Sequence, residues 1–161
     1  MKVEILSVKM LVKYGHKLEK RHIELQNELV LYAIMNDIRN GGNKLLVLVY
    51  RKCSTCQKAL KWLEEHNVEF DERPIVEENP TYEELKEWYV KSGMPLKKFF
   101  NTSGLLYKDM GLKDKLPTMS EDEQLKLLAT NGMLVKRPLV VGVDFVLTGF
   151  REKEWEEHLL A

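Results

Sequence analysis

Residues 45–70 have the sequence LLVLVYRKCSTCQKALKWLEEHNVEF, and this stretch decides the fold. Its first part, residues 45–50, is a short apolar run that follows Gly-Gly-Asn and predicts a buried strand. Apolar residues then recur at helical spacing over residues 54–66, and Asn67 marks the end of the predicted helix. Residues 68–70 predict a second strand. We therefore expect a β-α-β unit with parallel strands and a right-handed crossover.

Two capping boxes mark helices in the middle of the chain. Thr81 is followed three residues later by Glu84, and Ser120 is followed in the same way by Glu123. Each pair predicts a helix N-terminus, because the two side chains satisfy backbone N–H groups reciprocally. Between these helices, residues 95–100 predict a short helical turn that leads into a loop. The middle of the chain is therefore expected to be helical.

The C-terminal part returns to strands. Residues 139–143 and 145–148 are two short apolar runs and predict a β-hairpin, and residues 151–160 predict a closing helix. The element order β-α-β, helices, β-β-α matches the thioredoxin arrangement. We therefore predict an α/β thioredoxin-like fold with a mixed sheet and an inserted helical subdomain, spanning residues 44–161.

Residues 1–43 precede this domain as an N-terminal extension of unknown role. Residues 16–39 predict a helix that ends in a Gly-Gly linker. Three interpretations stay open. The segment is a docking or dimerising helix, an added cover for the domain, or the product of an upstream translation start that is not native.

Composition excludes several classes of protein. Lys and Arg together number 25, as do Asp and Glu, so the chain lacks the global positive charge of a nonspecific nucleic-acid binder. The longest apolar run near the N-terminus, residues 29–35, is far shorter than the roughly 20 residues that span a bilayer. Charged residues interrupt residues 1–20, unlike a secretory signal. We therefore expect a cytoplasmic protein with no membrane partner and no direct nucleic-acid partner.

The two cysteines of the chain form a Cys53-Ser54-Thr55-Cys56 motif at the predicted start of a helix. Their spacing of about one helical turn places both sulfurs on one side of the helix start. Free N–H groups and the helix dipole favour an anion there and lower a thiol pKa. Arg51 and Lys52 add positive charge. Cys53 is therefore predicted to be the nucleophile, and Cys56 to resolve the intermediate as a Cys53–Cys56 disulfide.

Two alternatives to redox chemistry remain for this motif. A zinc site needs two more ligands, and the only other candidates are four scattered histidines, His16, His22, His66 and His158. A pair of buried thiols that only fill space is the second alternative, because free cysteine packs as a small hydrophobic residue. The strand before the motif and the helix after it favour redox chemistry over both.

Several motifs in one order resemble a known family. They are KCSTCQKA at residues 52–59, WL at 62–63, FFNTSG at 99–104, KRPLV at 136–140 and GFR at 149–151. From Leu45 to its end, the chain resembles the ArsC-type arsenate reductases and the transcriptional regulator Spx. The second cysteine and the FNTSG and KRP segments resemble Spx-like members in particular.

The resemblance implies a role for each matching residue. Cys53 is the nucleophile, Pro138 is a cis-proline facing it, and Arg137 stabilises a thiolate or a bound oxyanion. Arg151 resembles a further anion-site arginine, and Gly104 lies near a glycine that contacts RNA polymerase in Spx-type regulators. From the residues alone, surface roles for both arginines and a strand-start role for the proline also stay open.

The resemblance to the reductases is incomplete. Glutaredoxin-linked arsenate reductases carry a single cysteine in this loop and an arginine where this chain has Asn101. We therefore predict a thiol-disulfide oxidoreductase without a tightly bound cofactor and without a metal, regenerated by an external thiol such as thioredoxin, glutaredoxin or glutathione. The alternative is an Spx-like redox-sensing regulator that binds RNA polymerase.

Overall fold

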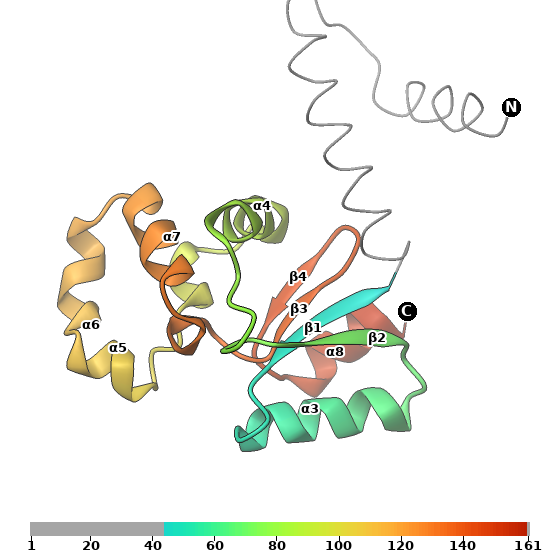
Figure 1. The fold of residues 1–161 in the computed structure, drawn as a ribbon. Coiled ribbons are helices and arrows are strands. Elements are labelled where there is room, and N and C mark those ends of the chain that lie inside the picture. Colours follow the sequence, from blue (N-terminus) through green and yellow to red (C-terminus); the bar gives the residue numbers. More distant parts are fainter. Residues whose placement is uncertain (1–43, 161) are drawn as a thin grey trace, which may run out of the picture. The chain divides into compact units, whose positions relative to one another are not determined.

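The computed structural model describes residues 44–160, which are built around a four-stranded sheet with strand order β2-β1-β3-β4 (Figure 1). The strands are β1 (Leu45–Val49), β2 (Phe70–Pro74), β3 (Leu139–Val141) and β4 (Val146–Thr148). β1 pairs with β2 in parallel and with β3 antiparallel, and β3 and β4 form an antiparallel hairpin. The predicted thioredoxin-like α/β arrangement with a mixed sheet is confirmed.

The second strand begins later than predicted. Residues 68–70 were expected to form it, but β2 starts only at Phe70. Asn67 takes a left-handed conformation with φ 54°, and the Val68 N–H then donates to the Leu63 carbonyl at 3.0 Å. Because this hydrogen bond closes the preceding helix, the Val68 N–H is not available to a strand ladder.

Both capping boxes are present at the predicted helix starts. Thr81 accepts a hydrogen bond from the Glu84 N–H, and Ser120 accepts one from the Glu123 N–H; each glutamate also reaches back to the backbone of its capping residue. The α-helices are α3 (Ser54–Glu65), α4 (Tyr82–Ser92), α5 (Leu105–Asp109), α6 (Leu112–Lys115), α7 (Glu121–Ala129) and α8 (Glu152–Leu159). Short 3-10 helices span Leu96–Phe99, Leu116–Thr118 and Gly132–Leu134.

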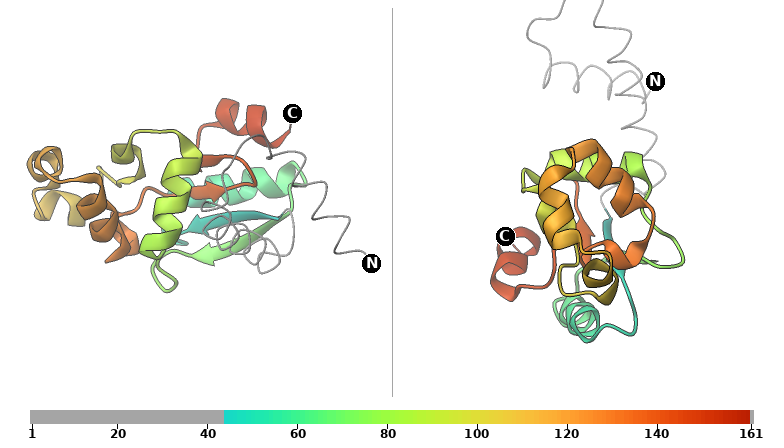
Figure 2. Two further views of the ribbon diagram at one scale, coloured as in Figure 1. Left: turned by 90° about the horizontal axis from the view of Figure 1, so that it is seen from above. Right: turned by 90° about the vertical axis from the view of Figure 1, so that its left-hand side faces the viewer.

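Alternating side chains of β1 enter two different cores. Val47 and Val49 pack with residues of α3 and α8 on one face of the sheet. Leu48 faces the other side, where α4 lies over the sheet (Figures 1 and 2). All three side chains have no exposed surface. Truncating Leu48 to alanine would cost about 2–5 kcal/mol in unfolding free energy, since a buried cavity would remain.

The helical middle shares its core with the sheet and extends from the end of the sheet at which β1 leads into α3 (Figure 1). At Gly132 the chain leaves the helical middle and turns back toward β3. A Cβ atom at this position would lie 1.8 Å from the Ile75 carbonyl oxygen, so only glycine permits the approach. The predicted insertion is therefore packed firmly against the loop that follows β2.

The N-terminal extension of residues 1–43, including the helix predicted over residues 16–39, lies outside the described residues. Among residues 44–160, no helix is both long enough and apolar enough to cross a membrane.

Candidate functional site

Cys53 lies at the N-cap of α3, where the predicted strand and helix meet. Its N–H donates to the Tyr50 carbonyl at 2.8 Å, which closes a tight turn after β1. Its backbone is extended, the usual conformation of a helix N-cap residue. The half-buried thiol therefore lies beside the unpaired N–H groups and the positive end of the dipole of α3.

Cys56 lies one turn further into α3 and has no exposed surface. It packs in the apolar cluster that joins α3 to the sheet, together with Val49 and Ala59. Burial raises its pKa to about 12, and the negative charge of an ionised Cys53 adds to this effect. Cys56 is therefore a protonated thiol at neutral pH, and it is shielded from solvent.

The environment of Cys53 lowers the pKa of its thiol, whereas that of Cys56 raises it. Partial burial by itself would raise its pKa, but hydrogen bonds from the Cys56 backbone and thiol, from the Arg137 side chain and from the Thr55 backbone outweigh burial and lower it. The two sulfurs thus differ in pKa although they belong to one motif. Of the two thiols, Cys53 is the one that ionises more readily and the one with solvent-exposed surface.

Arg137 and Pro138 directly precede β3, the strand that pairs with β1. The peptide bond between them is cis, as the resemblance implied, and Pro138 is buried. The Arg137 guanidinium lies 5.0 Å from the centre of the Tyr50 ring, and its Nη1 donates to the Met133 sulfur at 3.1 Å. The structure therefore places Arg137 close enough to Cys53 and Cys56 to act on both thiols, and the buried Pro138 follows it in the chain.

Three other basic residues either precede the two cysteines or match the family resemblance, and their contacts differ from those of Arg137. Arg51 forms two hydrogen bonds of 2.9 Å with the Glu72 carboxylate, so much of its charge is compensated. Lys52 is exposed and has no ion-pair partner among residues 44–160. Arg151 begins α8 and pairs with Glu154 at 2.8 Å. No contact within the described residues links Arg151 to the thiols.

Gly104 and Asn101 lie in the loop before α5. The Asn101 N–H donates to the Leu134 carbonyl at 2.7 Å, and its Nδ2 donates to the Met133 carbonyl at 3.4 Å. A Cβ at Gly104 would lie 2.7 Å from the Asn101 Nδ2. Gly104 is therefore connected to the thiol site only indirectly, through Asn101 and Met133.

Sequence reasoning missed two residues of the site. The sequence pattern indicates only that Tyr50 ends a strand, although its carbonyl accepts a hydrogen bond from the Cys53 N–H and its ring lies next to the Arg137 guanidinium. Met133 carried no signal, because an isolated methionine in a predicted turn has no chemical signature. Both take part through contacts across the chain rather than through a local motif.

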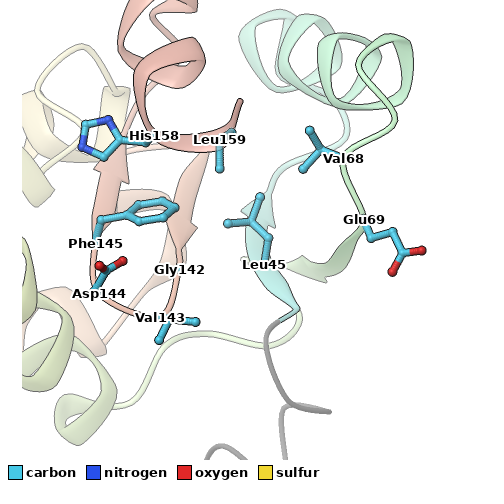
Figure 3. A pocket seen from close by; sticks show the side chains of 9 residues that line it. All are labelled: Leu45, Val68, Glu69, Gly142, Val143, Asp144, Phe145, His158 and Leu159. Atoms are coloured by element: carbon cyan, nitrogen blue, oxygen red, sulfur yellow. The ribbon is translucent and has the colours of Figure 1, made fainter. Parts of the chain in front are cut away.

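A surface hollow lies at the opposite end of β1 from Cys53. Its volume is about 240 Å³, and its walls include Leu45, Val68, Phe145 and Leu159 (Figure 3). It contains neither thiol. Elsewhere in the described part of the chain, no three His, Cys, Asp or Glu side chains gather in a way that would hold a metal ion. Both cysteines therefore lie away from this hollow, at the start of α3.

Comparisons with known proteins match most of this domain. The model of the ArsC family matches residues 48–158. The chain is 58% identical over 109 residues to the uncharacterized protein YusI of Bacillus subtilis, an alignment that covers 68% of this chain and 92% of YusI. It is 30% identical over 103 residues to the global transcriptional regulator Spx of Enterococcus faecalis, covering 63% and 76% of the two chains.

Among solved structures, an ArsC family related protein from Bacteroides fragilis has 63% sequence identity and a TM-score of 0.69. The match covers 71% of this chain and 96% of that protein.

Proposed function

The chain belongs to the ArsC family, and on that premise we propose that it is a thiol-disulfide oxidoreductase in which Cys53 attacks and Cys56 resolves. One observation carries the proposal: a partly exposed cysteine with a lowered pKa lies one helical turn from a buried cysteine with a raised pKa. A reductase needs this asymmetry, because one sulfur must attack the substrate and the other must wait.

The first half of the cycle reduces the substrate. The Cys53 thiolate attacks one sulfur of a substrate disulfide, whose S–S bond breaks as a mixed disulfide forms, and the departing sulfur takes up a proton. Cys56 then attacks the Cys53 sulfur. The second substrate sulfur leaves and accepts the proton from Cys56, so the substrate gains two electrons and two protons while the protein forms the Cys53–Cys56 disulfide.

The pKa values set the order of these steps. While Cys53 is a thiolate, its charge helps to keep Cys56 protonated. Once Cys53 is in a mixed disulfide, that charge is gone and one cause of the high Cys56 pKa disappears. Cys56 therefore becomes easier to ionise only after the substrate is attached, which favours attack on the mixed disulfide.

An external thiol of the thioredoxin, glutaredoxin or glutathione type restores the dithiol in this proposal. It attacks the Cys53 sulfur, which is the only one of the two cysteine sulfurs with solvent exposure. Exchange at Cys53 reverses the same chemistry and needs no further group from the protein.

A disulfide suits the charge of the site better than arsenate does. Among residues 44–160, three arginines are held by carboxylates: Arg51 by Glu72, Arg73 by Glu84 and Arg151 by Glu154. Arg137 alone has no carboxylate partner in this part of the chain. One guanidinium can offset one thiolate. A bound oxyanion beside that thiolate would add negative charge, and residues 44–160 hold no second arginine free of a carboxylate to balance it.

Turnover of a model disulfide tests the proposal. We expect the purified protein to reduce oxidised glutathione or hydroxyethyl disulfide when a thiol donor is supplied, and the Cys53→Ser variant to be inactive. The Cys56→Ser variant should accumulate a mixed disulfide. Absence of turnover by the wild-type protein with thioredoxin, glutaredoxin and glutathione donors alike would refute the enzyme proposal.

A redox-sensing regulator that binds RNA polymerase is the second candidate. It is supported by the similarity to Spx and by an apolar side chain next to Gly104, since Leu105 is 77% exposed. Because a side chain at Gly104 would displace Asn101, Leu105→Glu is the cleaner test of this surface. Co-purification of RNA polymerase with the wild-type protein, lost in Leu105→Glu, would favour the regulator.

A further inference from the structure

The Arg137 guanidinium contacts two residues from separate parts of the chain, Tyr50 and Met133, and we call this pair the seat of Arg137. The Tyr50 ring centre lies 5.0 Å from the guanidinium carbon, and the Met133 sulfur accepts from Nη1 at 3.1 Å. An aromatic face and a thioether both attract a guanidinium without neutralising it. A carboxylate in either place would compensate the positive charge that the Cys53 thiolate needs.

The backbone on both sides of the seat is fixed. The Met133 N–H donates to the Asn131 Oδ1 at 2.9 Å, the Met133 carbonyl accepts from the Asn101 Nδ2, and the neighbouring Gly132 is locked against Ile75. Tyr50 is fixed by its own carbonyl, which accepts the Cys53 N–H at 2.8 Å. The seat therefore ties Arg137 to the same turn that carries the nucleophile.

We propose that Tyr50 and Met133 are positioning residues that hold the Arg137 guanidinium against Cys53, so that the inserted helical segment acts on the nucleophile through the Met133 sulfur. This inference rests on the proposed role of Cys53 as the attacking thiolate. Without the seat, the long arginine side chain would sample other rotamers and spend less time beside the sulfur. The seat is thus part of the machinery that ionises Cys53, although neither residue contacts a substrate.

The test is a double-mutant cycle read by alkylation rather than by turnover. The rate of iodoacetamide reaction at Cys53 is measured against pH for wild type, Met133→Leu, Arg137→Met and the double variant. Removing an adjacent opposite charge lowers the ionised fraction by at least about tenfold, so Arg137→Met should slow the reaction by about tenfold at acidic pH. Met133→Leu should slow it by about threefold, because the guanidinium remains but is less constrained.

Four further variants separate positioning from packing. Met133→Gln restores an acceptor of similar length and should recover the wild-type pH profile. Tyr50→Phe keeps the ring and should match wild type, whereas Tyr50→Leu should resemble Met133→Leu. Met119→Leu, a methionine that packs half-buried against the same core but away from the thiols, is the matched control and should leave the profile unchanged.

The double-mutant cycle has an outcome that would refute the role of the seat. In the Arg137→Met background, Met133→Leu should have no additional effect, since the thioether acts only through the guanidinium. If Met133→Leu leaves the profile unchanged, or slows alkylation equally with and without Arg137, the seat is refuted. Because alkylation needs no substrate, the two failures can be told apart: an inactive enzyme whose Cys53 reactivity still depends on Met133 and Arg137 would overturn the proposed function but would show that the seat is present.

Discussion

Replacing Cys56 by alanine should make Cys53 less reactive, even though Cys56 does not touch the alkylating reagent. Hydrogen bonds from the Cys56 backbone and thiol are among the contacts that lower the Cys53 pKa against the opposing effect of burial. Cys56→Ala removes the thiol donor and keeps the backbone N–H. Cys56→Ser keeps a donor at the same place and is the matched control.

The size of the effect follows from the exposure of Cys53. A hydrogen bond to a charged group contributes about 1.5–3 kcal/mol. Solvent screens a half-buried thiol, so we take about 1 kcal/mol for the contact. That free energy changes the thiolate population by about fivefold. At a pH below the Cys53 pKa, Cys56→Ala should therefore be alkylated about five times more slowly than wild type.

The pH dependence of the alkylation rate shows in which direction the Cys53 pKa moves. Loss of the donor raises the Cys53 pKa, so the rate profile should move toward higher pH and meet the wild-type profile where both thiols are fully ionised. The assay is iodoacetamide reaction under pseudo-first-order conditions, with peptide mapping to confirm that Cys53 is the residue modified. Superimposable profiles of wild type and Cys56→Ala, or an equal shift in Cys56→Ser, would refute this reasoning.

Two further predictions concern the scaffold and are measured by urea unfolding. Trp155 is fully buried, and its Nε1 donates to the Gly149 carbonyl at 3.2 Å. Trp155→Phe should therefore lower the unfolding free energy by about 1–3 kcal/mol, because it leaves the carbonyl unpaired and removes buried volume. An unchanged urea midpoint would contradict this. Glu84 is partly buried, which alone would raise its pKa, but hydrogen bonds with Arg73 and Thr81 lower it. The stability that Glu84 contributes is therefore present above its unfolded pKa and is lost as pH falls through its folded pKa. Glu84→Gln keeps the capping box, so it should cost about 1–2 kcal/mol at pH 7 and less at acidic pH. An equal cost at both pH values would contradict the ion-pair explanation.

The features predicted correctly from sequence are mostly local ones. The capping boxes at Thr81 and Ser120 were predictable because each needs only residues three apart. The position of Cys53 at a strand-helix junction followed from two adjacent periodic patterns. The resemblance then implied the cis bond before Pro138, which local periodicity does not reveal.

The features that sequence could not show depend on long-range contacts. Arg51 was expected to add positive charge at the thiols, but β1 and β2 are parallel neighbours and bring Glu72 to it. Arg137 finds Tyr50 and Met133 only after the helical segment returns to the sheet. No pattern within a short window encodes which side chain a given arginine meets.

Mass spectrometry after reaction with a substoichiometric amount of oxidised glutathione tests the central claim most directly. The wild-type protein should end as an intramolecular Cys53–Cys56 disulfide, lighter than the reduced protein by the mass of two hydrogens. The Cys56→Ser variant should instead retain glutathione on Cys53. A stable glutathione adduct on the wild-type protein, or an adduct mapped to Cys56 in a Cys53→Ser variant, would contradict the assignment of the attacking and resolving thiols.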